Sequence, residues 1–193
     1  MTEIKFDPKK LAKLNDPERL KFQDPNLFWP LLALKNPKLM VEVGCGTGFY
    51  SAELLKLAPN AKLIGLDISE ELLSWARENR PEVSQGRLDL RLMPESQIPL
   101  ESQIADLVVM VMLHHELHQP LAILAECKRI LKPAGKLLIL DWAPVDSPMG
   151  PPAHIRVSAQ TMADQMAQAG FENVKTPKLY DWFGVAMGQS PSA

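Results

Sequence analysis

The stretch Val41–Gly48 reads Val-Glu-Val-Gly-Cys-Gly-Thr-Gly and holds three of the ten glycines in this 193-residue chain. Before it, Leu39–Val43 is apolar except at Glu42 and predicts a buried strand. After it, Phe49–Leu57 has the pattern of an amphipathic helix. The glycines therefore lie in a strand-to-helix turn. There glycine permits positive φ and close approach of a ligand to the backbone, next to unpaired N–H groups of the helix.

Segments with the pattern of a strand alternate with segments with the pattern of a helix along the rest of the chain. Further strands are predicted at 61–66, 87–93, 105–112, 136–141, 172–176 and 182–187. Helices are predicted at 69–79, 120–131 and 158–169, with Ser69 and Ser158 as N-caps, and a turn at 132–135. Such alternation implies parallel β-α-β units. We therefore expect an α/β fold, a three-layer Rossmann-like sandwich in which helices cover both faces of a mostly parallel seven-stranded sheet.

An acidic residue follows the second predicted strand. Asp67 lies 19 residues after Gly48, the spacing at which a carboxylate accepts hydrogen bonds from ribose hydroxyls. That arrangement suits any adenosine-containing cofactor. The dinucleotide fingerprint G-x-G-x-x-G is not matched, because the third glycine comes one residue early and Phe49 stands at the sixth position. The carboxylate of Glu42 would also repel the negative charge of a pyrophosphate, yet it suits a ligand that carries an amino group.

These residues resemble the first motif of class I S-adenosylmethionine-dependent methyltransferases, of the methyltransferase type 11 kind. Three later segments are similar to further motifs of that family, and the resemblance is strong over residues 38–142: Ile98–Val109, Leu113–His115 and Arg129–Lys136. The resemblance implies S-adenosyl-L-methionine as cofactor. It also implies which residues contact it: Gly44, Cys45, Gly46 and Gly48 at the methionine portion, Glu42 at its amino end, and Asp67 at the ribose. Ile68, which follows Asp67, is a further expected cofactor-binding residue.

The chain departs from the family pattern near the expected adenine site. Family members commonly carry an Asp five residues before the proline that matches Pro99, and here that position is Pro94. The nearest acid is Glu95. The adenine amino group is therefore expected to be held by Glu95 or by backbone alone.

Three of the four histidines gather after the fourth predicted strand, as His114, His115 and His118. The zinc-protease motif H-E-x-x-H fails, because Glu116 stands beside His115 rather than beside His114, so we predict no metal site. His115 or Glu116 is the candidate general base, since both should face the pocket. The alternative is that these side chains shape the pocket or cap the next helix.

The first 37 residues have a different, Pro-rich character. Asp16-Pro17 predicts a helix start, and Pro30 predicts a kink or two short pieces. We expect residues 1–37 to form an N-terminal helical extension or cap, acting as a flap over the site or packing on the sheet. Residues 38–193 are expected to form one S-adenosylmethionine-binding domain.

Composition narrows the class of partner. The net charge of -2 gives no basic footprint for nucleic acid, and two distant cysteines suit a reducing compartment. No run of 18 apolar residues and no signal-peptide pattern occurs, so no membrane partner and a cytoplasmic location are expected. We therefore predict an enzyme that transfers a methyl group to a small-molecule acceptor by in-line displacement. The alternative is a non-catalytic S-adenosylmethionine-binding sensor or partner subunit.

Overall fold

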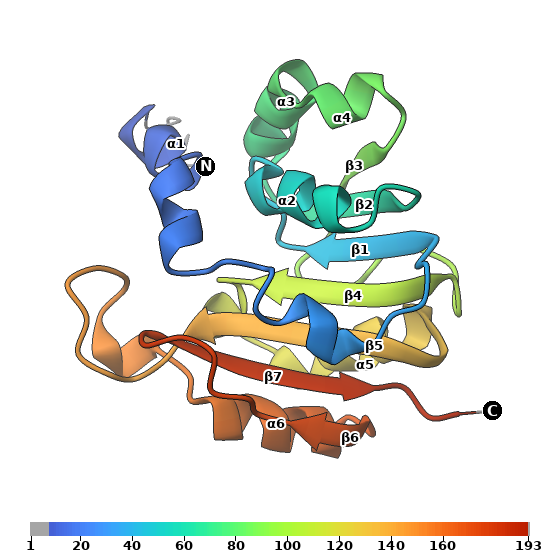
Figure 1. Cartoon of the computed structure of the whole chain (residues 1–193), viewed down its shortest axis with the longest axis vertical. Coiled ribbons are helices and arrows are strands. Elements are labelled where there is room, and N and C mark those ends of the chain that lie inside the picture. Colours follow the sequence, from blue (N-terminus) through green and yellow to red (C-terminus); the bar gives the residue numbers. More distant parts are fainter. Residues whose placement is uncertain (1–7, 193) are drawn as a thin grey trace.

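The protein is built on one seven-stranded sheet, seen in a computed structural model that describes residues 8–192 (Figure 1). The strand order is β3-β2-β1-β4-β5-β7-β6. Strands β1 to β5 run parallel, whereas β7 is antiparallel to both β5 and β6. The strands are β1 (Leu39–Val43), β2 (Lys62–Asp67), β3 (Leu88–Leu92), β4 (Ala105–Val111), β5 (Leu131–Trp142), β6 (Glu172–Lys175) and β7 (Phe183–Gln189).

Helices cover both faces of this sheet, which confirms the predicted three-layer α/β fold. The α-helices are α1 (Pro8–Leu14), α2 (Phe49–Leu57), α3 (Glu70–Asn79), α4 (Pro81–Ser84), α5 (Pro120–Ile130) and α6 (Ala159–Gln168). Alternate residues of β4 enter different apolar clusters: Val109 packs with side chains of α2 and α3, and Val108 with those of α5 and α6. Because side chains alternate across a strand, β4 is buried on both faces, as its continuous apolar run predicts.

Three predicted helix starts are present. Ser69 accepts a hydrogen bond from the Leu72 backbone N–H at 3.3 Å, and Ser158 accepts one from the Thr161 N–H at 3.0 Å. Asp16 caps the short 3-10 helix η1 (Pro17–Lys21) through the Glu18 N–H at 2.9 Å. Each cap satisfies an N–H group that would otherwise lack a partner.

One predicted boundary is wrong. The segment 132–135 was expected to be a turn ahead of the fifth strand, but β5 begins at Leu131 and includes it. Ala105 pairs with Leu131 and Leu107 with Lys136, so two steps along β4 face five along β5. The extra residues bulge out, with Ala134 at φ 57°. Because β4 and β5 pair both before and after the bulge, β5 is one strand that continues through it.

The described part of the N-terminal region packs on the rest of the molecule. Phe28 and Leu32 are buried in the same apolar cluster as Met40 of β1. The Tyr50 hydroxyl donates to the Gln23 carbonyl at 2.8 Å. Pro30 lies inside a second 3-10 helix, η2 (Trp29–Leu32), where the first turn tolerates it. Residues 1–7 of the predicted extension lie outside the described residues, and its status as a separate cap stays a prediction.

Candidate functional site

The glycine loop lies at the carboxyl end of β1, beside the point where strand order reverses between β1 and β4. Gly44, Gly46 and Gly48 have φ of 75°, 53° and 67°, the left-handed region that favours glycine. The N–H groups of Gly44 and Cys45 both donate to the Leu66 carbonyl, at 2.7 and 2.9 Å. The loop is therefore fixed to the end of β2.

The start and the middle of the loop differ in the space around the backbone. A Cβ added at Gly44 would lie 2.8 Å from the Leu113 side chain, so the segment after β4 packs directly on the first glycine. A Cβ added at Gly46 would meet only Leu72, at 3.9 Å. The open side of the loop therefore lies at its middle, where a ligand can approach the backbone.

Asp67 joins the end of β2 to the middle of the loop. Its Oδ2 accepts from the Gly46 N–H at 2.6 Å and its Oδ1 from the Ser69 N–H at 2.9 Å. A carboxylate oxygen has a further lone pair beyond the one used in each bond. Ile68 beside it is exposed. Both residues thus lie at the edge where the sequence predicts the ribose contact.

Glu42 is a buried carboxyl group in the strand that leads into the loop. Its side chain is 1% exposed and accepts a hydrogen bond from the Ser51 hydroxyl of α2. Burial raises the pKa of Glu42 to about 8, although the Ser51 hydrogen bond and the charge of Arg19 oppose that rise. A ligand ammonium placed here would favour the ionised carboxylate, so the residue suits the amino end of the expected cofactor.

The N-terminal region also reaches the loop. Oδ1 of Asn15 accepts from the Thr47 hydroxyl at 2.9 Å and from the Arg80 guanidinium. The Arg19 guanidinium lies 5.0 Å from the centre of the Phe49 ring, at the start of α2. The sequence analysis missed Asn15, Arg19 and Arg80. Only the tertiary structure brings them to the loop, since each lies 30 or more positions from the residue it contacts there, Thr47 or Phe49.

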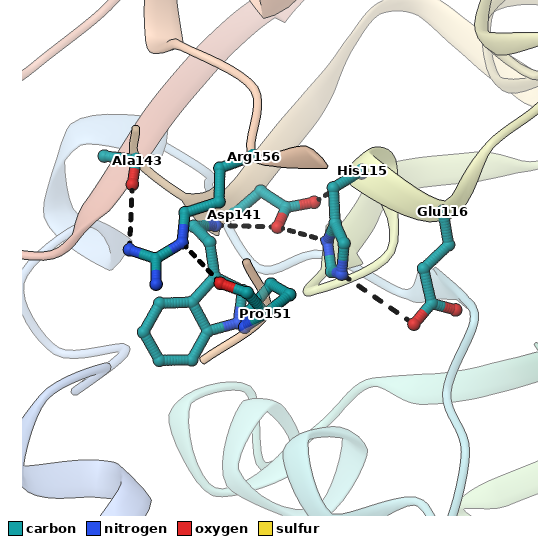
Figure 2. A network of polar contacts seen from close by, with 7 residues as sticks. His115, Glu116, Asp141, Ala143, Pro151 and Arg156 are labelled. Atoms are coloured by element: carbon teal, nitrogen blue, oxygen red, sulfur yellow. Dashed lines mark hydrogen bonds and ion pairs between the residues drawn. The ribbon is translucent and has the colours of Figure 1, made fainter. Parts of the chain in front are cut away.

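His115 and Asp141 form a closely paired couple at the ends of two neighbouring strands. His115 lies in η3 (His114–Glu116) after β4, and Asp141 lies in β5. Their Nδ1 and Oδ1 atoms are 2.7 Å apart, and the other oxygen, Oδ2, accepts from the His115 backbone N–H at 3.0 Å. The side chains are 6% and 0% exposed. Figure 2 shows Asp141 and Glu116 on opposite sides of the His115 ring.

The other polar residues after β4 point to different partners. Glu116 is 69% exposed, and its Oε1 lies 3.8 Å from Nε2 of His115. His114 is buried with Nε2 2.7 Å from the Gln165 side chain, and burial lowers its pKa. His118 and Glu95 form an exposed pair at 2.6 Å. The structure thus brings His115 and Glu116 together but places Glu95 beside His118.

The Pro-rich loop after β5, residues 143–152, is held in place by hydrogen bonds to Arg156. Sequence reasoning also missed this arginine. Its guanidinium donates to the carbonyls of Pro151 and Val145, at 2.8 and 2.7 Å (the Pro151 contact is drawn in Figure 2). It also lies 5.4 Å from the centre of the Trp142 ring. Trp142 follows Asp141 directly, so this loop borders the His115–Asp141 couple.

Two hollows in the described residues lie away from this site. One of about 420 Å³ is bordered by Gln103, Lys128 and Pro133, and one of about 260 Å³ by Leu31, Lys136 and Asn173. Neither includes a residue of the glycine loop. Over residues 8–192, no group of three His, Cys, Asp or Glu side chains is arranged to hold a metal ion, and no helix is long and apolar enough to span a membrane.

The chain is similar to known methyltransferases in sequence and in fold. A family model described as a methyltransferase domain matches residues 41–139. A solved S-adenosylmethionine-dependent methyltransferase from Aquifex aeolicus is 30% identical, with a TM-score of 0.86, over 96% of this chain and 99% of that one. A trans-aconitate 2-methyltransferase from Azoarcus sp. is 30% identical over 84% of this chain and 67% of its own.

A probable S-adenosylmethionine-dependent methyltransferase from Mycolicibacterium smegmatis is 28% identical over 76% of this chain. The chain spans 57% of the length of that relative, and smaller shares of the next curated relatives. The family model and the Aquifex structure confirm the family and the cofactor that the sequence predicts. The chain belongs to the S-adenosylmethionine-dependent methyltransferases of class I.

Proposed function

We propose that this protein transfers a methyl group from S-adenosylmethionine to a small-molecule acceptor by in-line displacement. The observation that carries the proposal is the pair of buried acids, Glu42 and Asp67, on either side of a glycine loop with three positive φ angles. Bound there, the cofactor supplies a methyl group already activated as a sulfonium. The protein's contribution is then to hold the acceptor in line with that group.

Each predicted cofactor residue has a role that fits its place. Glu42 faces the amino end of the cofactor, and Asp67 accepts hydrogen bonds from the ribose. Backbone groups of Gly44, Cys45, Gly46 and Gly48 line the methionine portion. Exposed Ile68 covers an apolar part of the adenosine, and Glu95 receives the adenine amino group after breaking its contact with His118.

The acceptor is proposed to bind between η3 and the loop after β5. His115 and Glu116 lie on one side of this region as candidate bases, and Trp142 lies on the other. Exposed Val145 and Met149 in the same loop, and exposed Ile155 in the 3-10 helix that follows it (Ala153–Ile155), suit an acceptor with an apolar part. A relative named as a trans-aconitate 2-methyltransferase supports a small-molecule acceptor in general, and not its apolar part. Residues 1–37 are proposed to cap the cofactor end of the site.

Isothermal titration with S-adenosylhomocysteine, with NADH as comparison ligand, tests the cofactor site. We expect binding of the first in the micromolar range, about -8 kcal/mol, and none of the second. Asp89→Ala, at an exposed Asp of β3 paired with Arg91, is the matched control for Asp67→Ala. Tight binding of NADH, or equal affinity in wild type and Asp67→Ala, would contradict the proposed site. Transfer of radiolabelled methyl groups to an acceptor panel then tests turnover.

A further inference from the structure

We propose that Asp141 is a positioning residue that holds His115 as the general base, and that the acceptor is a hydroxyl compound whose proton leaves during methyl transfer. The inference rests on the proposed function and deepens it. It selects His115 over Glu116, assigns a role to Asp141, and names the class of acceptor.

The backbone places the couple beside the glycine loop. Strand β4 ends at Val111, and Met112 then adopts φ 56°, a conformation that is costly for a residue with a side chain. This turn sends Leu113 onto Gly44, where the leucine fills the space of the missing Cβ. His115 follows two residues later, so the segment that packs on the first glycine also carries the histidine.

The carboxylate fixes which ring nitrogen holds the proton. An ionised carboxylate only accepts hydrogen bonds, so the 2.7 Å contact requires the hydrogen of neutral His115 on Nδ1. Asp141 itself is held, because its oxygens also accept from the backbone N–H groups of His115 and Trp142 at 3.0 and 2.7 Å. Nε2 is left as the acceptor nitrogen. Among the described residues it makes no hydrogen bond, and Glu116 lies 3.8 Å away.

The charges around the ring favour a base that can take up a proton. Burial disfavours the imidazolium, but the hydrogen bond and charge of Asp141, with a smaller contribution from Glu116, outweigh it and raise the pKa of His115. A protonated His114 on the same turn would lower the pKa of His115 by charge repulsion. Burial lowers the pKa of His114 itself, which favours its neutral form. Glu116 is mostly exposed, and within residues 8–192 its carboxylate accepts no hydrogen bond, so it is the weaker candidate.

The proposed step balances in atoms and charge. The acceptor O–H bond breaks as Nε2 of His115 forms a bond to the proton. The oxygen electron pair forms the new bond to the methyl carbon, and the pair of the broken sulfur–carbon bond stays on sulfur. The products are a methyl ether, a neutral thioether and an imidazolium facing Asp141, which returns its proton to water. A carboxylic acid is already ionised near neutral pH and needs no such base, whereas a phenol or enol does.

The first test needs no acceptor and uses wild-type protein. Nitrogen-15 spectra of the imidazoles report the tautomer and the titration of each histidine, with and without S-adenosylhomocysteine, and His115→Gln assigns the signal. We expect neutral His115 to carry its proton on Nδ1 and to titrate above the ordinary range. Exposed His154 serves as the internal reference. A proton on Nε2 in neutral wild-type protein would overturn the proposal.

Asp141→Asn then tests the positioning role, with thermal melting to show that the variant is folded. In this variant we expect the pKa of His115 to fall and its Nδ1–H tautomer to lose population, while the affinity for S-adenosylhomocysteine stays unchanged. An unchanged His115 titration in the folded variant would contradict the role of Asp141. If the variant does not fold, the wild-type tautomer still decides the assignment.

Turnover separates the acceptor classes. Phenols and enols are offered beside matched carboxylic acids, with labelled S-adenosylmethionine. Methyl transfer to phenols or enols that falls about 100-fold or more in kcat in His115→Gln, and loses its rise with pH, supports the proposal. Methyl transfer to carboxylates that His115→Gln retains would overturn it. Failure of the cofactor titration would instead contradict the proposed function, and the tautomer would still be measured.

Discussion

Oδ2 of Asp67 lies 2.6 Å from the backbone nitrogen of Gly46, so the acid at the end of β2 holds the middle of the glycine loop. Its other oxygen accepts from the Ser69 N–H, one residue before α3 begins. One carboxylate therefore links the loop, the second strand and the third helix. A ribose that binds here would donate its hydroxyls to a carboxylate that the Gly46 and Ser69 N–H groups already hold in place. Binding then costs less conformational entropy, because the Asp67 side chain is ordered beforehand.

Replacing Asp67 is expected to affect both binding and folding. Asp67→Ala should weaken S-adenosylhomocysteine binding by about 1–3 kcal/mol, the typical value of a hydrogen bond to a charged group. It should also lower the melting temperature, because the Gly46 and Ser69 N–H groups lose their partner. Calorimetric titration and thermal unfolding, with Asp89→Ala as the control, measure the two effects. A folded Asp67→Ala protein with wild-type affinity would place the ribose elsewhere.

Glu42 is expected to make the stability of the free protein depend on pH. The native carboxyl keeps its proton up to pH about 8, whereas the unfolded chain releases it near 4.5. Between these values the native state binds more protons, so its stability falls as pH rises. Glu42→Gln should therefore match wild type near pH 4, below the pKa of the unfolded chain, and exceed its stability by on the order of 1–4 kcal/mol at pH 8.5. Urea unfolding at both pH values measures this.

The same variant should bind cofactor less well. Loss of the carboxylate removes the partner of the ligand ammonium, which corresponds to roughly 10- to 100-fold in affinity for S-adenosylhomocysteine. Glu101→Gln, an exposed residue, is the matched control and should change neither property. Undiminished affinity of Glu42→Gln would show that the amino group lies away from β1.

Phe28 is expected to be a core residue despite its place in the N-terminal region. Its side chain is fully buried, so Phe28→Ala should cost about 3–5 kcal/mol of unfolding free energy. Leu27→Ala removes an exposed neighbour and should stay within about 0.5 kcal/mol of wild type. Chemical denaturation compares them. A small effect of Phe28→Ala would mean that this region opens independently of the sheet.

Asn15 is expected to influence cofactor release rather than folding. Asn15→Ala removes the shared acceptor of the Thr47 hydroxyl and the Arg80 guanidinium across the loop. S-adenosylhomocysteine should leave about 2- to 10-fold faster, the equivalent of one hydrogen bond. Stopped-flow displacement measures the rate, and Asn26→Ala, in an exposed turn of the same region, is the control. Equal release rates would argue against a capping role.

Arg156 is expected to order the acceptor side of the site. Arg156→Ala removes contacts to the Pro151 and Val145 carbonyls, so amide hydrogens of residues 143–155 should exchange faster. The affinity for S-adenosylhomocysteine should not change, because these residues lie beyond β5. Hydrogen exchange with mass spectrometry tests this, with exposed Arg91→Ala as the comparison. Wild-type protection in Arg156→Ala would show that prolines alone hold the loop.

Local patterns in the sequence are enough for much of the fold. The period of apolar residues, the caps Ser69 and Ser158 and the glycine turn act within a few positions of one another, and each element they predict is present. The turn at 132–135 is the exception, because whether a strand stops or bulges depends on the partner strand. That pairing with Ala105 lies 26 positions away and leaves no local signal.

The sequence by itself determined the family and the cofactor and predicted the candidate site residues, because the glycine spacing and the following acid are read along one strand–turn–helix–strand unit. The tertiary structure alone decided which groups meet: Asn15 at the Thr47 hydroxyl, Arg80 at the Thr47 carbonyl, Asp141 at His115, and Arg156 over Trp142. These pairs join residues separated by 14 to 33 positions in the chain. Their encounter depends on the order in which parallel strands assemble, and a contact between carboxyl ends of neighbouring strands has no periodic pattern in the sequence.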